Sequence, residues 1–493
     1  MQSPTSTPKP SVLAWFARAA ETGDPYAQFN LGLMYKHGDG VERDDVEACL
    51  WLERAARQRL AFAQNHLGSM VFQGRGLPQS DADAAYWFGL AADQGDASAQ
   101  QNLGDLYRTG RGVTRDPGEA VAWYYKAAEQ DLASAQRLLG ECYLDGEGVA
   151  PSLPLAMAWF RKAAVLEDAQ AEVALGLMYR NGQGVPPSES EALYWFRRAA
   201  GRGHAAAQRL LGLSCLAGHG SPPDMQGARA WLACAAEQGD AEAQFSLGQL
   251  LAGSSGAPPR MQPRLEPGSE PGAHSDAQPG AHPGNSALEW TQAAAEQGHV
   301  LAQYSLGNLY AYGRGVARDP ARALHWYRRA AEQGAANAQF TLGRMYANGE
   351  GVRRDERIAV EWYRRAAEQG DASAQNNLGV MYANGQGVVQ DDAEAVRWYR
   401  LAAEQGHALA QYNLGGMYNS GRGVARDTVR SYMWMLLAAD AGDPAASANK
   451  AIVARRLSQQ QIDSAIDMRG AWLRAWRRRA GADGNAAAER RAV

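Results

Sequence analysis

One short pattern in this sequence matches a nucleophile motif: Ser447-Ala448-Asn449-Lys450. In the S-x-x-K motif of penicillin-recognising enzymes, a lysine activates a serine hydroxyl. Those enzymes also carry S-D-N and K-T-G motifs, and neither follows here. The sequence also lacks a phosphate-binding glycine loop, an H-E-x-x-H motif and a G-x-S-x-G elbow. We therefore interpret the match as coincidental and predict no catalytic residues.

Histidines and cysteines, which often bind metal ions, occur here in patterns that do not suggest a metal site. His274 and His282 lie in two PGAH segments of a low-complexity stretch, where we expect no fixed geometry. The four cysteines share no regular spacing and form no C-x-x-C pair: Cys49, Cys142, Cys215 and Cys234. We predict no metal ion, no cofactor and no disulfide framework, and interpret the cysteines as small buried residues in a reducing compartment.

The charge composition does not favour a nucleic acid or a membrane as partner. Lysine and arginine number 49 against 53 aspartate and glutamate residues, for a formal net charge of -4. Arginine pairs such as Arg364-Arg365 are followed within one turn by a glutamate, here Glu368, so we interpret them as a solvated helix face. Because the sequence shows neither a membrane span nor a signal-peptide core, we predict a cytoplasmic protein and leave export by a specialised route open.

A repeat of 36 residues organises the chain. An Ala-Gln pair or a near equivalent, followed by Leu-Gly, recurs at this step from Ala27 to Ala243 and again from Ala302 to Ala410. The step from Ala243 to Ala302 is 59 residues, which places a single insertion in the seventh of eleven repeats. Such a period is typical of a solenoid, in which each unit buries its apolar face against its neighbours.

Each unit reads as a pair of helices. In the unit that begins at Ala338, apolar residues follow at i+4, i+7 and i+8, which is one face of a helix. Gly349 and Gly351 then supply the positive-φ positions of a helix end and a turn, and Asp355 is placed to begin a second helix. Small residues such as Gly343 allow the helices to approach closely, while aromatic residues of the second helix supply large buried areas.

The repeat pattern LGxxYxxGxGVxxDxxxAxxWYxxAAEQG resembles the Sel1-like repeat, a relative of the tetratricopeptide repeat, from about residue 11 to about residue 442. The resemblance implies an all-α fold, a right-handed α/α superhelical solenoid of about eleven 36-residue helix-pair repeats with helical caps. It also implies an adaptor or scaffold for protein partners rather than an enzyme. Some cysteine-rich secreted relatives are stapled by disulfides and linked to penicillin binding, but the cysteines here do not follow that arrangement.

The repeats and the composition together define the expected domain boundaries. Trp15 lies in a lone second helix that would cap the N-terminal end, and Ser458 with Gln461 forms a capping-box signature near the C-terminal end. The insertion is rich in Pro, Gly and Ser and is expected to be disordered. The predicted parts are a disordered start at 1–10, a cap helix and repeats one to seven (first part) at 11–252, the insertion at 253–285, the second helix of repeat seven to repeat eleven at 286–442, capping helices at 443–479, and a disordered tail at 480–493.

The first helix of each unit carries side chains on the face opposite its apolar stripe, and several of these are aromatic. The resemblance implies that first helices line the concave surface, where exposed aromatic residues beside Asn and Arg would favour partner binding. The alternative is that each ring packs on the adjacent repeat. The candidate partner-binding residues are Phe245, Tyr304, Asn308, Tyr312, Phe340, Arg344, Asn376 and Tyr412.

Our functional prediction is a non-enzymatic scaffold that binds a protein or an extended peptide on its concave face, with no small-molecule substrate. Two alternatives remain open at this point. One is an enzyme that acts on cell-wall or β-lactam substrates, by analogy with the cysteine-rich relatives. The other is an exported factor that binds a host protein.

Overall fold

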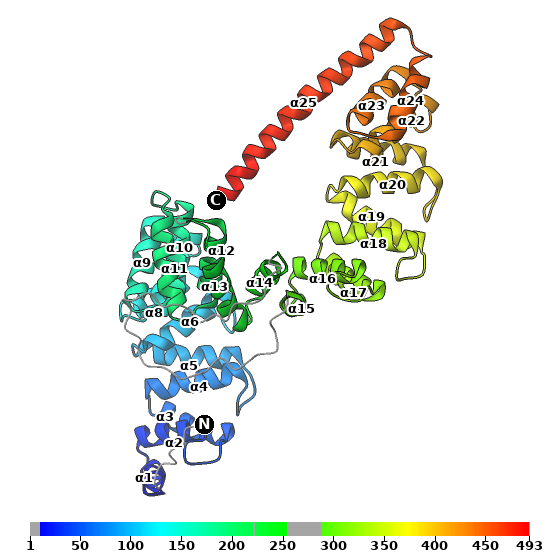
Figure 1. Ribbon diagram of the computed structural model, residues 1–493. Helices are drawn as coiled ribbons and strands as arrows, with labels where there is room; N and C mark the ends of the chain where they lie inside the picture. The colour runs from blue at the N-terminus through cyan, green and yellow to red at the C-terminus, as the bar shows by residue number, and fades with distance from the viewer. Residues whose placement is uncertain (1–9, 220–221, 254–286, 493) are drawn as a thin grey trace. The chain divides into compact units, whose positions relative to one another are not determined.

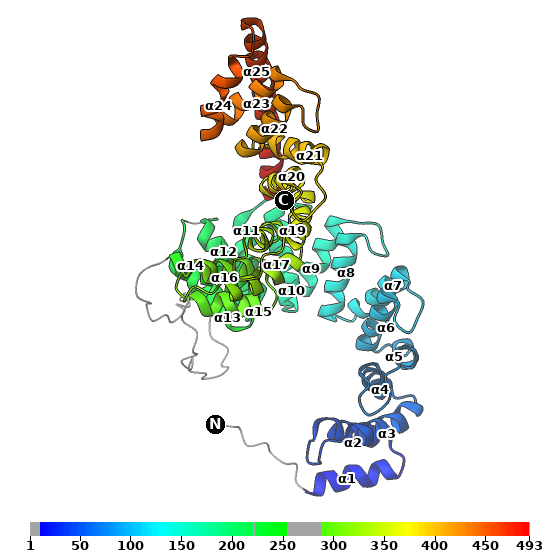
Figure 2. The ribbon, with the colours of Figure 1, turned by 90° about the vertical axis from the view of Figure 1, so that its right-hand side faces the viewer.

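The computed structural model of the protein describes residues 10–219, 222–253 and 287–492, which form twenty-five α-helices and no β-strand. The chain divides into two compact units, Met1–Asp224 and Met225–Val493. Within each unit successive helices pack as pairs in chain order (Figure 1), and Figure 2 shows the same succession from a second direction. The predicted all-α repeat solenoid is confirmed.

In each repeat a first helix is followed by a second helix. The first unit contains α1 (Pro10–Glu21), α2 (Pro25–His37) with α3 (Asp45–Arg57), α4 (Ala61–Gln73) with α5 (Asp81–Asp93), α6 (Ala97–Thr109) with α7 (Pro117–Ala128), α8 (Ala133–Asp145) with α9 (Leu153–Val165), α10 (Ala169–Asn181) with α11 (Glu189–Gly201), and α12 (Ala205–Ala217).

The second unit continues the same alternation to the C-terminus. It contains α13 (Met225–Glu237), α14 (Ala241–Gly253) with α15 (Ala287–Glu296), α16 (Val300–Tyr312) with α17 (Pro320–Glu332), α18 (Ala336–Asn348) with α19 (Glu356–Glu368), α20 (Ala372–Asn384) with α21 (Asp392–Glu404), α22 (Ala408–Ser420) with α23 (Thr428–Asp440), α24 (Pro444–Ala454) and α25 (Gln459–Ala492). Within the described ranges, every helix is too short or too polar to cross a membrane.

The helix boundaries follow from capping residues that the repeat supplies. In repeat nine, Gly349 ends α18 at φ +75°, a left-handed conformation that glycine adopts without steric cost. The Asp355 carboxylate accepts hydrogen bonds from the backbone N–H groups of Arg357 and Ile358 and thereby begins α19. The turn between the two helices is therefore determined locally, as the sequence predicts.

Small and large side chains interlock where the two helices of a repeat cross. A Cβ atom at Gly343 in α18 would lie 2.5 Å from the ring of Tyr363 in α19, and one at Gly379 in α20 would lie 2.7 Å from Tyr399 in α21. Both tyrosine side chains are buried. Glycine is therefore required here because an aromatic ring occupies the space that a larger residue would need.

A buried glutamine in the first helix connects three helices in almost every repeat. Its Nε2 donates to a backbone carbonyl of the preceding second helix, at 3.0 to 3.3 Å. In seven repeats its Oε1 also accepts from a glutamine at the end of its own second helix, at 2.6 to 2.9 Å. The buried glutamines with both bonds are Gln28, Gln64, Gln100, Gln244, Gln303, Gln339 and Gln375.

Repeat seven is complete on both sides of the insertion. Gln297 donates to Gln244 at 2.8 Å, and a Cβ atom at Gly248 would lie 2.7 Å from Thr291 Oγ1, so α14 and α15 pack as the other pairs do. The helix α15 has 10 residues where α14 has 13. The predicted insertion at 253–285 lies outside the described residues apart from Gly253, which ends α14.

The two ends differ in how far the structure follows the sequence. The helix α1 lies where the sequence predicts a lone second helix, and residues 1–9 lie outside the described part. Ser458 N donates to Gln461 Oε1 and Gln461 N donates to Ser458 Oγ, so the capping box forms at the start of α25. The helix α25 runs on to Ala492, and the disordered tail expected at 480–493 stays a prediction.

Two second-helix arginines contact the next repeat. Arg364 donates to the Tyr382 hydroxyl of the next first helix at 3.0 Å, and Arg400 donates to Tyr418 at 3.2 Å. Arg365 lies over the ring of Trp362 at 4.5 Å. The interpretation of Arg364 as part of a merely solvated face is incomplete, because its half-buried guanidinium connects consecutive repeats, as that of the exposed Arg400 does.

We expect Gln375→Met to destabilise its repeat by about 1 to 2 kcal/mol, because Gln405 loses its acceptor and the Ala367 carbonyl of α19 loses one of its two donors, keeping only the Gly370 N–H. The control is Gln411→Met, since Gln411 Oε1 already lacks a hydrogen-bond partner and only the bond to Ala403 is lost. Hydrogen exchange of the neighbouring helices reports the local free energy of opening. Equal losses in the two variants would contradict the role assigned to the paired amides.

Candidate functional site

The candidate aromatic residues lie on the first helices, but their rings are only partly free. Tyr304, Phe340 and Tyr412 are half-buried. The Tyr304 ring lies 5.5 Å from that of Tyr327, and the Phe340 ring lies 5.9 Å from that of Tyr363. The rings of Tyr304 and Phe340 therefore pack on the second helix of their own repeat with one part and are exposed on the first-helix face with the other.

Two of the eight candidates are buried. Phe245 is 6% exposed, with its ring 4.8 Å from His299, and Asn376 is 1% exposed. The expectation that both face a groove is wrong, because the neighbouring repeat covers the side that a single helix would leave open. Asn376 instead accepts a hydrogen bond from Asn413 of the next first helix at 3.0 Å.

The other three candidates differ in how free they are. Tyr312 is 56% exposed, with the Arg314 guanidinium over its ring at 5.4 Å. Asn308 accepts a hydrogen bond from the Tyr327 hydroxyl at 2.7 Å, which fixes its carboxamide. Arg344 lies 3.8 Å from Glu350, and both side chains are 41% exposed. Tyr312 and Arg344 are thus the candidates most available to a partner.

A hollow of about 530 Å³ lies beside Tyr412, between α20, α22 and α24. Its apolar lining residues include Val380, Met417 and Ile452. Arg422 also lines it, but its guanidinium donates to Asp392 at 2.7 Å. The uncharged polar residues around the hollow are Asn384, Tyr399, Tyr412, Asn413, Asn419, Ser420 and Asn449. Among the described lining residues none is acidic, so the hollow is largely neutral.

The sequence prediction missed the asparagines of this hollow. If the alanine of the Ala-Gln pair is the first position of a repeat, a side chain at the third position contacts one at the fourth position of the next repeat. For example, Asn449 Nδ2 donates to the Tyr412 hydroxyl at 2.8 Å. In the first unit, Asn102 donates to Asn65 at 2.9 Å in the same way. The signal in the sequence was the recurrence of amides at these two positions, which becomes meaningful only when adjacent first helices are known to lie side by side.

The potential nucleophiles are not activated. Burial raises the pKa of Cys49 and that of Cys142 to about 11, which disfavours the reactive thiolate. The Ser447 hydroxyl donates to the Asp443 carbonyl of its own helix at 3.0 Å. In the ranges that the structure describes, no three His, Cys, Asp or Glu side chains are grouped as metal ligands.

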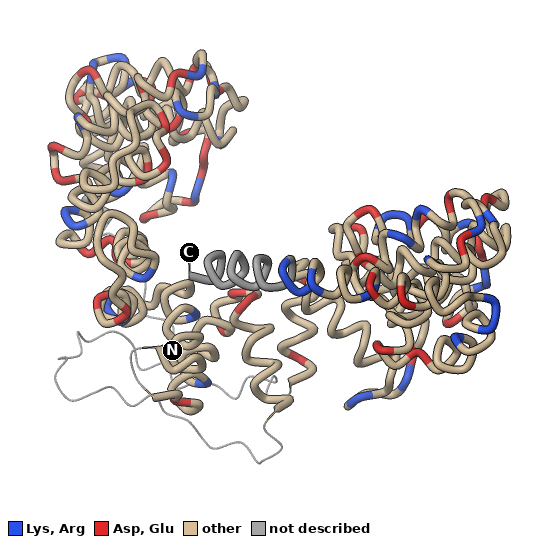
Figure 3. Tube along the Cα trace, turned by 90° about the horizontal axis from the view of Figure 1, so that it is seen from above, with Lys and Arg blue, Asp and Glu red and all other residues tan. Residues whose placement is uncertain are grey.

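Acidic and basic positions are interspersed along each unit in Figure 3.

Three histidines have a structural role that the sequence reading did not identify. His299 precedes α16, and its Nδ1 accepts a hydrogen bond from the backbone N–H of Ala302 at 3.1 Å. His204 and His407 cap α12 and α22 in the same manner. In several other repeats an aspartate performs this function, so imidazole replaces carboxylate as the capping acceptor.

Comparison with protein families identifies the repeat. A family model described as Sel1 repeat matches residues 25–60, 61–96, 97–132, 133–166, 168–204, 205–240, 284–299, 300–334, 336–371, 372–407 and 408–443. The chain belongs to the Sel1 repeat family.

Solved structures agree with this assignment. A protective antigen of uropathogenic Escherichia coli, described as displaying an SLR fold, is 36% identical, with 94% of this chain and 96% of that chain covered and a TM-score of 0.63. A Sel1 repeat protein from Oxalobacter formigenes is 34% identical, with 46% of this chain and 93% of that chain covered and a TM-score of 0.44. A comparison with curated proteins found no match.

One Sel1 repeat replaces the paired amides with charges. Glu172 occupies the buried glutamine position of repeat five and is fully buried. Its carboxylate lies 3.0 Å from Arg198 and 3.6 Å from Arg202, which stands where other repeats have the second glutamine. Burial raises the pKa of Glu172, while the two arginines oppose that rise. Here an ion cluster takes the place of neutral hydrogen bonds.

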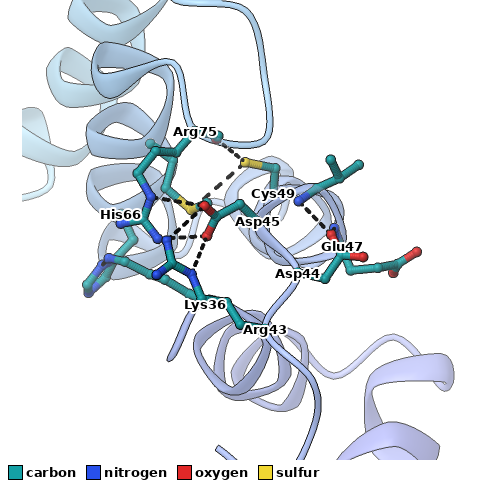
Figure 4. Close-up of polar contacts among 10 residues, drawn as sticks. Lys36, Arg43, Asp44, Asp45, Glu47, Cys49, His66 and Arg75 are labelled. Atoms are coloured by element: carbon teal, nitrogen blue, oxygen red, sulfur yellow. Dashed lines mark hydrogen bonds and ion pairs between the residues drawn. The ribbon is translucent and has the colours of Figure 1, made fainter. Parts of the chain in front are cut away.

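A second connection between Sel1 repeats lies at the edge of the stack, and Figure 4 shows it between repeats one and two. Asp45 begins α3 and lies 2.6 Å from Arg75 of the next repeat and 3.1 Å from Arg43. The hydrogen bonds from Arg75 and Arg43 lower the pKa of Asp45 to about 2. Nearby, Lys36 Nζ lies 3.1 Å from His66 Nδ1, and burial lowers the pKa of His66 to about 4. The neutral imidazole can therefore accept from the lysine.

We expect Asp45→Asn to lower the stability of the first two Sel1 repeats by about 0.5 to 1 kcal/mol at pH 7, the range of partly exposed ion pairs. Because the folded-state pKa lies below the ordinary 3.8, this contribution is present above about pH 4 and is lost as the pH falls toward 2. Urea unfolding at several pH values measures it, with Glu42→Gln as the control. A difference between wild type and Asp45→Asn that is undiminished at pH 2 would contradict this assignment.

Proposed function

We propose that this protein is a non-enzymatic scaffold that binds a protein or an extended peptide on its first-helix face. The observation that carries the proposal is the row of partly exposed aromatic residues on α16 and α18, formed by Tyr304, Tyr312 and Phe340. Each second helix already fills the core of its repeat, so these rings keep apolar surface that packing does not use. Such rings commonly provide the main anchors of an interface.

The chemistry beside these rings supports a polypeptide ligand. Arg344 offers a half-exposed guanidinium, and Asn308 holds a fixed carboxamide between the aromatic side chains. Aromatic, amide and guanidinium groups together are favoured at protein interfaces. The Sel1 repeat fold is typical of proteins that bind other proteins, which agrees with this chemistry.

A second candidate is an exported factor that binds a host protein. The observation that favours it is that the 36% identical relative is a protective antigen of a pathogenic strain. The cytoplasmic location stays a prediction, and fractionation of cells and medium distinguishes the two. Recovery in the cell fraction alone would contradict the exported candidate, and recovery in the medium would contradict the cytoplasmic one.

We expect the triple change Tyr304→Ser, Tyr312→Ser and Phe340→Ser to weaken capture of the partner at least about thirtyfold, as loss of interface anchors worth about 2 kcal/mol does. The partner is first identified by affinity capture with the intact chain and mass spectrometry, and its Kd is then measured. Because Tyr304 and Phe340 also pack, the single change Tyr312→Ser is measured as well. It should leave stability within about 0.5 kcal/mol.

The matched control is Tyr86→Ser with Tyr194→Ser, two tyrosines on second helices that are 61% and 51% exposed. These changes remove the same chemical group from second helices of the first unit, α5 and α11, and should leave the Kd unchanged. If the aromatic triple folds and binds the partner with the wild-type Kd, the binding surface lies elsewhere. If the control pair weakens binding as much as the triple, the first-helix assignment is wrong.

A further inference from the structure

The hollow between α20, α22 and α24 contains a glycine that folding does not require. Gly416 lies inside α22, where glycine costs about 1 kcal/mol of helix stability relative to alanine. A Cβ atom at Gly415, its neighbour, would lie 3.2 Å from Met435 and 3.2 Å from the Ser431 carbonyl, so a larger residue there would press on α23. A Cβ atom at Gly416 would meet no atom within 4 Å. Gly416 therefore leaves space above the helix rather than making room for another part of the chain.

The side chains around this space are amides held in place by their neighbours. Asn413 donates to Asn376 at 3.0 Å and Asn449 donates to Tyr412 at 2.8 Å, so both carboxamides have fixed positions. Both bonds use Nδ2, and among the described residues the Oδ1 atoms of Asn413 and Asn449 accept no hydrogen bond. An entering N–H group can therefore donate to either oxygen. The hollow is thus prepared for a ligand with hydrogen-bond donors.

The absence of net charge narrows the class of ligand. The one cation in the lining, Arg422, already pairs with Asp392, and none of the described lining residues is acidic. A carboxamide carries one acceptor group and one donor group, as a peptide unit does. Asparagines around a neutral hollow therefore match the polypeptide main chain better than they match a phosphate, a metal ion or a charged side chain.

We propose that this hollow binds an extended, uncharged peptide segment through its main chain, which passes over Gly416 and donates a hydrogen bond to Asn413 Oδ1. The inference rests on the proposed function and names the ligand that one part of the first-helix face takes. Close approach of a backbone is a recognised reason for glycine in a helix. Val380 and Ile452, which line the hollow, offer apolar contacts to small side chains of the bound segment.

The test begins with selection of random 12-residue peptides, displayed on their encoding RNA, against the intact chain. Selected peptides are synthesised with acetyl and amide caps, and their Kd is measured. We expect Gly416→Ala to weaken binding at least tenfold while the melting midpoint stays the same or rises by about 2 °C. Asn413→Ala and N-methylation of single peptide units should also weaken binding at least tenfold, because each removes one partner of the main-chain bond.

The matched control is Gly89→Ala. Gly89 lies inside α5, and a Cβ atom there also meets no atom within 4 Å, but α5 is a second helix. This change should raise stability in the same way and leave the Kd unchanged. A structural role for Gly416 would instead appear as a lower melting midpoint in Gly416→Ala.

Three results would overturn the inference. These are the absence of any selected peptide, a Kd that Gly416→Ala does not alter, and binding that requires a peptide carboxylate together with Arg422. The proposed function is judged separately by the aromatic triple. If that triple loses the captured partner while Gly416→Ala has no effect, the scaffold function stands and the main-chain site falls. If neither change affects any ligand, both fall.

Discussion

The buried glutamine of each first helix is the interaction on which the stack depends. A carboxamide placed among three helices must find partners for its donor and its acceptor, because a buried polar atom left unpaired costs about 1 to 3 kcal/mol. Gln339 meets this requirement by joining the Ala331 carbonyl of the preceding second helix to Gln369 of its own. Since both bonds need all three helices in place, the amide sets the register between repeats, which apolar packing alone specifies less sharply.

The exceptions show how this constraint can be relaxed. Leu166 stands where a second glutamine is expected, and Gln136 Oε1 is accordingly buried without a partner. Repeat five keeps the connection but changes its chemistry, since Glu172 meets Arg198 and Arg202 instead of an amide. A buried charge is tolerated there only because cations lie beside it. The junction between repeats is therefore fixed in geometry and variable in the groups that make it.

On the first-helix face, too, some side chains maintain the fold and others do not. The rings of Tyr304 and Phe340 pack in the core with one side and are exposed with the other. Replacing either ring would therefore change both ligand binding and the stability of the repeat. Tyr312 and Gly416 lie outside this coupling, the first because it is exposed and the second because no part of the chain occupies the space above it. Positions of this kind can change with the ligand at little cost to the fold.

The sequence by itself determined the helix pairs, their 36-residue register and the caps at Gly349 and Asp355, because these depend on contacts within a few residues or on a repeated pattern. It also identified Tyr312 as a surface residue. Only the tertiary structure decided that Phe245 and Asn376 are buried and that a hollow lies beside Tyr412. A helical projection describes one helix alone, whereas the burial of its outer face depends on the neighbouring repeat, whose distance and rotation no local pattern encodes.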